Sequence, residues 1–188
     1  MGWFTMAAVF WGADKPVPRP GDPAPEFAKL PATAGGTKGL ADFADRDVLV
    51  IAVTCNECPF AREAEPKLLA FARKYAANPR VALVAISSSQ HPEDSFAEMK
   101  KRAAAKGYDF PYLHDADQAV ARALHAYVTP EFFVYGKDRK LMYHGRWEEA
   151  DDGAALVEPA VAALLAGRPA PAWQRPLGCP IKFAAKPK

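Results

Sequence analysis

Two cysteines, Cys55 and Cys58, are separated by two residues and form the pattern CxxC. They directly follow the apolar run 48–54 and directly precede an amphipathic helical pattern that starts at Pro59. If the second cysteine lies in the first turn of that helix, thiols at this spacing can close a small disulfide ring. Free backbone N–H groups and the positive end of the helix dipole there favour a thiolate at the first cysteine. The position therefore predicts a redox pair.

A CxxC also occurs as half of a structural zinc site, in which a second pair of Cys or His at similar spacing supplies the remaining ligands. The chain has three cysteines and four histidines, and they form no such second pair. The histidines are scattered, and each is interpreted as a surface or capped residue: His91, His114, His125 and His144. Two buried structural cysteines are the other alternative. The position between a strand and a helix favours a redox pair over both.

Cys179 is the thiol that remains if Cys55 and Cys58 close a disulfide. It lies in a C-terminal tail rich in Pro and Lys, where an incidental thiol is one interpretation. The other interpretation is a tail thiol that folds back onto the CxxC, either as a second resolving partner or as a guard of the site. The sequence leaves both interpretations open.

The bulk composition is that of one globular domain with extensions. Half of the 188 residues are hydrophobic, and a chain of this length buries one sizeable core. Lys and Arg total 24 against 22 Asp and Glu, with no long block of either sign, so neither a nucleic acid nor a membrane surface is indicated as a partner. We expect the domain to span 20–168, between an apolar start with a Pro-rich lead-in at 1–19 and a tail at 169–188.

The apolar stretch 3–13 is too short to cross a bilayer, which takes about 20 residues. It resembles the hydrophobic part of a secretory signal. However, no basic residue precedes it, and Trp11 disrupts the small-residue cleavage pattern that would end at Ala13. A cytoplasmic location and export to the periplasm are therefore equally compatible with the sequence.

Hydrophobic spacing predicts the elements that position the cysteines. The run 48–54 has the length and β-branched content of a buried strand. A helix then runs from Pro59 until Asn78 and Pro79 close it, and a second buried strand follows at 81–86. This order gives a right-handed crossover and a parallel pair of strands. The remaining elements are a helix at 92–106, an extended segment at 109–113, a helix at 117–127, a hairpin of 132–135 with 140–144, and a last helix at 156–165.

This order of motifs resembles the thioredoxin fold, in which a CxxC follows the central strand and a Thr-Pro, here Thr129 and Pro130, opens the hairpin. The stretch between the second buried strand and the hairpin resembles the extra segment of peroxiredoxins. Four segments resemble more specifically a group of peroxiredoxin-like proteins, of the AhpC/TSA or redoxin type, that carry a thioredoxin-type CxxC: 55–60, 129–133, 143–146 and 178–182. The resemblance implies an α/β, thioredoxin-like fold. A central mixed β-sheet flanked by helices is expected, with a peroxiredoxin-type insertion, an extended Pro-rich N-terminus and a C-terminal tail.

The resemblance also implies the roles of the site residues. Cys55 becomes the nucleophilic thiol and Cys58 the resolving thiol. Pro130 becomes a cis-proline that faces them, although only about 5% of X-Pro bonds in folded proteins are cis. A cis bond there would expose the backbone of Thr129 to an extended peptide or a mixed-disulfide partner. Thr129 and Pro130 are therefore the expected substrate-binding residues.

A thiol peroxidase and a disulfide reductase differ in the residues around the reactive cysteine. Peroxiredoxins carry the pattern Pro-x-x-x-Thr-x-x-Cys, and when it is aligned on Cys58 its Thr and Pro positions hold Cys55 and Ile51. Thr54 lies at another offset, and Arg146 is the remaining candidate for the peroxiredoxin arginine. Thiol-disulfide exchange needs only a thiolate, a nearby resolving thiol and access. We therefore expect a thiol-disulfide oxidoreductase, with a thiol peroxidase as the alternative.

The expected partners are a protein or small-molecule disulfide, or a peroxide in the alternative, and an external thiol that donates electrons. No cofactor and no metal are expected for either reaction. A copper-binding module of the same fold, with two Cys and one His as ligands, is the second alternative.

Glu57, between the two cysteines, is expected to tune their redox poise. Its negative charge opposes thiolate formation, whereas the helix dipole favours it. We expect a couple that acts as a reductant. A potential near that of strong oxidants, about −120 mV, would contradict this expectation.

Overall fold

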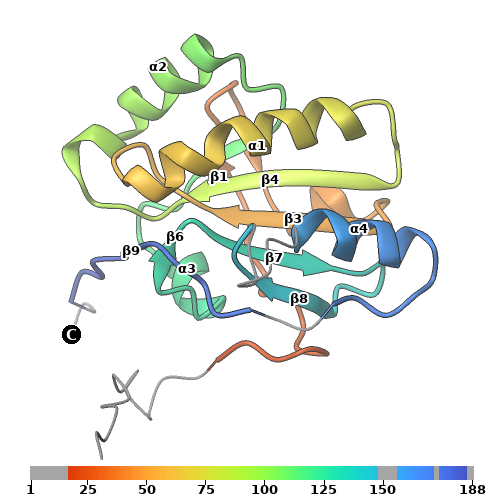
Figure 1. The fold of residues 1–188 in the computed structure, drawn as a ribbon. Coiled ribbons are helices and arrows are strands. Elements are labelled where there is room, and N and C mark those ends of the chain that lie inside the picture. Colours follow the sequence, from red (N-terminus) through yellow and green to blue (C-terminus); the bar gives the residue numbers. More distant parts are fainter. Residues whose placement is uncertain (1–16, 148–155, 172–173, 186–188) are drawn as a thin grey trace, which may run out of the picture.

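The computed structural model describes residues 17–147, 156–171 and 174–185, and a five-stranded mixed sheet forms its centre (Figure 1). The strand order is β5-β4-β3-β7-β8. These strands are β3 (Val48–Val53), β4 (Val81–Ser87), β5 (Tyr112–His114), β7 (Glu131–Tyr135) and β8 (Leu141–Gly145). Because β3 pairs parallel with β4 and antiparallel with β7, the strand that leads into the CxxC lies in the middle of the sheet.

Helices cover both faces of this sheet (Figure 1). One face carries α1 (Pro59–Tyr75), α2 (Phe96–Lys106) and α4 (Val157–Leu165), and the other carries α3 (Ala119–Ala123) and the N-terminal segment. That segment contains the short pair β1 (Leu30–Pro31) and β2 (Thr37–Lys38) and the 3-10 turn η1 (Leu40–Phe43). A second 3-10 turn, η2 (Pro92–Asp94), precedes α2, and β6 (Val128–Thr129) pairs with β9 (Cys179–Pro180).

Alternate residues of β3 face the two halves of the core. Val48, Val50 and Ala52 pack in the half that contains α1 and α4, whereas the residues between them, through Val53, pack in the half that contains α3 and η1. The whole strand is at most 1% exposed, because both of its faces are covered. The expected α/β architecture, a central mixed sheet flanked by helices, is confirmed.

The expected helix at 92–106 is divided in two. Pro92 starts the turn η2, Ser95 is extended with ψ of 151°, and α2 begins at Phe96. At this break the side chain of Asp94, which is 0% exposed, reaches the loop between the two cysteines. Gly107 ends α2 in the left-handed conformation, with φ of 65°, where the sequence predicted the end of a helix.

The expected helix at 117–127 is shorter in the structure, where α3 comprises five residues. Gln118 before it and His125 after it have positive φ angles of 59° and 53°, which the helix cannot continue through. Tyr127 therefore leaves the helix and leads into β6 instead.

Residues 21–24 run along the outer edge of the β7-β8 hairpin. The N–H of Gly21 donates to the carbonyl oxygen of Leu141, and the N–H of Leu141 donates to the carbonyl oxygen of Asp22, both at 2.8 Å. This segment thus covers an edge of the sheet that would otherwise be open. The apolar stretch 3–13 lies outside the described residues. Within the described ranges, no helix has both the length and the apolar character needed to cross a membrane.

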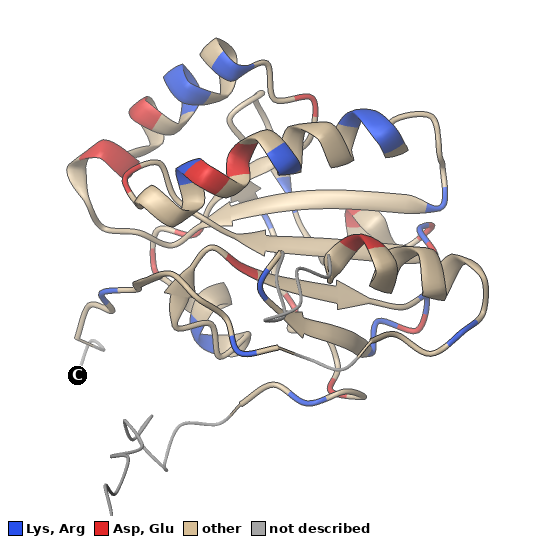
Figure 2. Ribbon diagram, viewed as in Figure 1, with Lys and Arg blue, Asp and Glu red and all other residues tan. Residues whose placement is uncertain are grey.

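Charged residues of both signs are intermixed along α1 and α2, and the central strands contain almost none (Figure 2). Glu131, the first residue of β7, is an exception. It is 1% exposed, so a carboxylate lies buried where β7 begins.

Candidate active site

Cys55 and Cys58 lie at the junction of β3 and α1. Cys55 follows the strand after Thr54, and Cys58 is the N-cap of α1, with Pro59 as the first helical residue. Pro is tolerated there because the N–H that it lacks would have no partner in the first turn. Cys55 is 8% exposed and Cys58 is 0% exposed, so Cys55 is the member of the pair with access to solution.

Thr129 contacts both thiols from β6. Its hydroxyl oxygen lies 3.3 Å from Cys55 Sγ, and its carbonyl oxygen accepts a hydrogen bond from the Cys58 thiol at 2.9 Å. The peptide bond between Thr129 and Pro130 is cis. The structure therefore brings these four predicted site residues together.

A buried carboxylate holds the loop between the two cysteines. Asp94 Oδ1 accepts hydrogen bonds from the backbone N–H groups of Asn56 at 2.5 Å and Glu57 at 3.1 Å. The Asn56 side chain donates to the carbonyl oxygen of Glu93 at 2.9 Å and accepts from the Tyr112 hydroxyl at 3.1 Å. Sequence reasoning missed this support, because an acidic residue near a helix start by itself indicates only a favourable interaction with the helix dipole.

Burial raises the pKa of Cys55 to about 11. The hydrogen bond with Thr129 lowers this pKa, and the negative charge of Asp94 raises it further. Cys55 is therefore held as a thiol at neutral pH. Glu57, the expected tuning residue, is exposed, so water screens its charge, and Asp94 is the carboxylate that acts on Cys55.

Cys179 packs against the cluster of Cys55, Cys58 and Ala61. Burial alone raises the pKa of Cys58, but hydrogen bonds from the Cys179 thiol and from the backbone at Ala61 and Cys179 outweigh it and lower the pKa below its ordinary value. The pKa of Cys179 is raised to about 12, first by burial and then by its hydrogen bond with Cys58. The thiolate form is therefore favoured at Cys58, whereas Cys55 is the more exposed cysteine of the CxxC.

Asp94→Asn is expected to increase the alkylation rate of Cys55 at pH 8 by about threefold or more, because it removes a nearby negative charge. The amide oxygen of the substituted side chain can still accept the two backbone N–H groups, so the loop should keep its shape. The rate is measured with iodoacetamide between pH 7 and 10, with the modified cysteine identified by mass spectrometry. In the wild type it should rise about tenfold per pH unit, since Cys55 remains below its pKa.

Glu57→Gln is the matched control for this prediction, since it removes one charge from the same loop at an exposed position. It should change the alkylation rate of Cys55 little. An acceleration with Glu57→Gln and none with Asp94→Asn would show that the charge of Glu57, and not that of Asp94, acts on the thiol.

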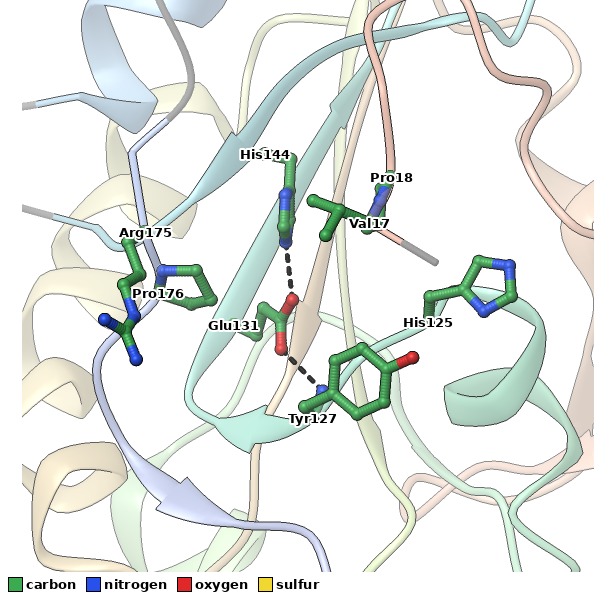
Figure 3. Close-up of a pocket in the computed structure, with 8 residues that line it drawn as sticks. All are labelled: Val17, Pro18, His125, Tyr127, Glu131, His144, Arg175 and Pro176. Atoms are coloured by element: carbon green, nitrogen blue, oxygen red, sulfur yellow. Dashed lines mark hydrogen bonds and ion pairs between the residues drawn. The ribbon is translucent and has the colours of Figure 1, made fainter. Parts of the chain in front are cut away.

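A buried contact between a carboxylate and an imidazole supports the loop in front of Pro130 (Figure 3). Glu131 Oε1 lies 2.5 Å from His144 Nε2, and Glu131 Oε2 accepts the N–H groups of Tyr127 at 2.8 Å and Val128 at 3.2 Å. Glu131 and His144 are 1% and 3% exposed and border a hollow of about 250 Å³. His144 is thus not on the surface, and sequence reasoning missed Glu131 because no pattern linked it to a histidine on the next strand.

The two remaining accessory candidates, Thr54 and Arg146, lie close to the site in different ways. Thr54 is 8% exposed, and its N–H continues the pairing of β3 with β4. Arg146 lines a hollow of about 200 Å³ together with Pro130, Phe60 and Leu177. Arg146 therefore shares a recess with the cis-proline.

Within the residues that the structure describes, no group of three His, Cys, Asp or Glu side chains is arranged to hold a metal ion. The copper-binding alternative therefore has no ligand set in this part of the chain.

The chain matches one family model and is similar to solved structures, two of which share more than a third of its sequence. The model of the AhpC/TSA family matches residues 20–144. A hypothetical protein from Sinorhizobium meliloti is 37% identical, with a TM-score of 0.81 over 89% of this chain and 96% of that one. An uncharacterized conserved protein from Geobacillus kaustophilus is also 37% identical, with a TM-score of 0.82 over 90% of this chain and 94% of that one.

More distant structures share the fold. Peroxidoxin BcpB from Mycobacterium tuberculosis is 23% identical, with a TM-score of 0.57 over 66% of this chain and 83% of that one. This likeness bears on the fold alone. No curated protein matches the chain.

Proposed function

The chain belongs to the AhpC/TSA family and has a thioredoxin-like fold, and we propose that it is a thiol-disulfide oxidoreductase in which Cys55 and Cys58 form the redox couple. The observation that carries this proposal is the placement of the two thiols. Cys55 has access to solution, Cys58 lies behind it at the start of α1, and both contact Thr129 in front of the cis-proline.

The reaction follows from this placement. The Cys55 thiolate attacks one sulfur of a substrate disulfide, a mixed disulfide forms, and the other substrate sulfur leaves as a thiol after taking a proton. Cys58 then attacks the Cys55 sulfur and releases the second substrate thiol. The lowered pKa of Cys58 assists this second step, because the attacking group is a thiolate. An external thiol returns the resulting disulfide to two thiols.

A couple that acts as a reductant is favoured by the raised pKa of Cys55. Strong oxidants of this class owe their potential to a stabilised reduced form, in which the first cysteine is a thiolate. Burial and Asp94 act in the opposite direction here. We therefore still propose a reducing couple, as the sequence suggested, but attribute it to burial and Asp94 instead of Glu57.

A protein or peptide disulfide is the proposed substrate. Phe60 and Leu177 are 41% and 56% exposed, and both line the recess that contains Pro130. Large exposed apolar side chains beside a reactive group suit a peptide partner. Pro130 is the proposed contact of its backbone, Arg146 is the cation in the same recess, and Thr129 becomes a further contact only where β9 leaves its edge.

A thiol peroxidase that uses Cys58 is less consistent with the site. Cys58 is 0% exposed, and the aligned positions of the two peroxiredoxin helpers hold Cys55 and the fully buried Ile51. Of the two thiols in the CxxC, a peroxide would therefore meet Cys55 first.

Two rates test the proposal on the full chain. With dithiothreitol as the electron donor, the reduced wild type is expected to accelerate the reduction of insulin disulfides. Hydrogen peroxide supplied at the same concentration should be consumed more slowly. Fast peroxide consumption together with no insulin reduction would favour the peroxidase over the reductase.

A further inference from the structure

The C-terminal tail lies directly against the cis-proline loop. β9 pairs antiparallel with β6, so that Cys179 is the register partner of Thr129. Gly178 allows this approach, because a Cβ added there would lie 2.2 Å from the Thr129 carbonyl oxygen. Such a contact with backbone cannot be relieved by a side-chain rotation. Glycine at 178 is thus required for the tail to reach this position.

Further hydrogen bonds fix the tail beyond the two-residue strand. The N–H of Ile181 donates to the carbonyl oxygen of Tyr127 at 2.8 Å. The side chain of Gln118, which is 0% exposed, donates to the carbonyl oxygen of Lys182 at 2.9 Å and accepts the N–H of Ala184 at 2.7 Å. A buried amide that satisfies two backbone groups of the tail indicates a built docking site for it.

The tail also changes the expectation for Thr129. The sequence suggested that its backbone is open to an extended partner, but β9 occupies that edge in the structure. An intramolecular segment therefore lies where a substrate strand was expected, and its cysteine packs against Cys55, Cys58 and Ala61.

We propose that Cys179 is a third redox-active thiol, and that Cys58 exchanges its disulfide partner between Cys55 and Cys179. The inference rests on the proposed function, which supplies the oxidised Cys55–Cys58 pair. Cys58 is suited to this exchange because it lies in one buried cluster with Cys55, and Cys179 packs against that cluster from β9. The tail strand, fixed on both sides of Cys179, supplies the geometry.

The exchange balances without any external reagent. Cys179 loses its proton, and its sulfur attacks the Cys58 sulfur of the Cys55–Cys58 disulfide. The bond between Cys58 and Cys179 forms as the bond between Cys55 and Cys58 breaks, and the electron pair leaves with the Cys55 sulfur, which takes up a proton. The molecule remains oxidised by two electrons, but Cys55 is a thiol again. The disulfide then ties the tail across the edge of Thr129.

The Cys55→Ser variant tests the inference directly, because Cys58 and Cys179 are its only cysteines. The reduced full-length variant is oxidised with a small molar excess of diamide, free thiols are blocked with N-ethylmaleimide, and the peptides are mapped by mass spectrometry. We expect an intramolecular disulfide between Cys58 and Cys179 in most molecules. Alkylation of both cysteines, or disulfides only between chains, would overturn the inference. Cys55→Ala is oxidised in parallel, so that the result does not depend on one substitution.

A variant of the tail tests whether the Cys58–Cys179 disulfide depends on the docked position of β9. Gly178→Ala, introduced into Cys55→Ser, should lose most of the Cys58–Cys179 disulfide, since the new Cβ displaces β9. Gly136→Ala is the matched control, because its Cβ would meet only the Asp138 carboxylate oxygen, at 3.3 Å, and two atoms farther away. An undiminished disulfide in the Gly178→Ala variant would contradict the proposed role of β9.

The two proposals fail in different measurements. If the wild-type chain does not reduce insulin, the proposed function fails, whereas the disulfide in Cys55→Ser still decides whether Cys179 is redox-active. If insulin is reduced and that disulfide does not form, only the further inference is wrong.

Discussion

Cys55→Ser is expected to lower the rate of insulin reduction by at least about 10³-fold, because the serine hydroxyl does not form the mixed disulfide. The loss should be this large since no other sulfur can take over the first step. Cys58 is 0% exposed, and in the reduced protein burial and the free Cys58 thiol raise the pKa of Cys179 to about 12, whereas the contribution of Cys58 is absent once Cys58 is in a disulfide. The measurement is the dithiothreitol-coupled insulin assay, with the circular dichroism spectrum as a check of folding.

Cys58→Ser is the informative counterpart, because it should stop the reaction after the first step instead of before it. We expect one half of the substrate to remain attached to Cys55 through a mixed disulfide, which is detected as an added mass on the peptide that contains Cys55. A variant with Cys55 replaced should carry no such adduct. If Cys58→Ser lost all reactivity while Cys55→Ser kept it, the two roles would have to be exchanged, and peroxide chemistry at Cys58 would become the better explanation.

The site is assembled from four stretches of chain that are far apart in sequence. The loop after β3 supplies both thiols, η2 supplies the carboxylate that holds this loop, β6 supplies Thr129, and β9 supplies Cys179. The reactive cysteine is thereby kept protonated and largely buried, with 8% of its surface exposed. Its reactivity would increase if the covering segments moved, because burial is the largest cause of its raised pKa.

Local patterns in the sequence predict the part of this site that depends on neighbouring residues. The apolar run ending at Val53 has the composition of a central strand, and Pro59 marks the start of a helix, so the position of the CxxC between them follows. The resemblance to the thioredoxin fold adds Thr129 and Pro130.

The contacts that tune the site could not be predicted in this way. Asp94 lies 37 and 38 residues along the chain from the two N–H groups that it accepts, and β9 is a two-residue strand without any periodic pattern. Such contacts depend on the folded arrangement of separate elements, and one sequence carries no signal that pairs them. The same holds for Glu131 and His144, which come together only because β7 and β8 are adjacent.

The Glu131–His144 pair supports the second large prediction, which concerns stability. Glu131→Ala is expected to lower the free energy of unfolding by about 3–5 kcal/mol, because it leaves an imidazole and two backbone N–H groups buried without this carboxylate. For a chain of this size the melting temperature should fall by about 10 °C. The measurement is thermal or denaturant unfolding followed by circular dichroism.

Glu131→Gln separates the charge of this group from its shape. The amide oxygen can still accept from Tyr127 and Val128, so the loss of stability should be smaller than with alanine. Insulin reduction by Glu131→Gln should also fall less than by Glu131→Ala, since Glu131 directly follows Pro130 and anchors the two residues before Thr129. Equal stability of Glu131→Ala and the wild type would mean that the pair does not support the cis-proline loop. The position of Thr129 against the two thiols would then have to depend on β9 and the sheet alone.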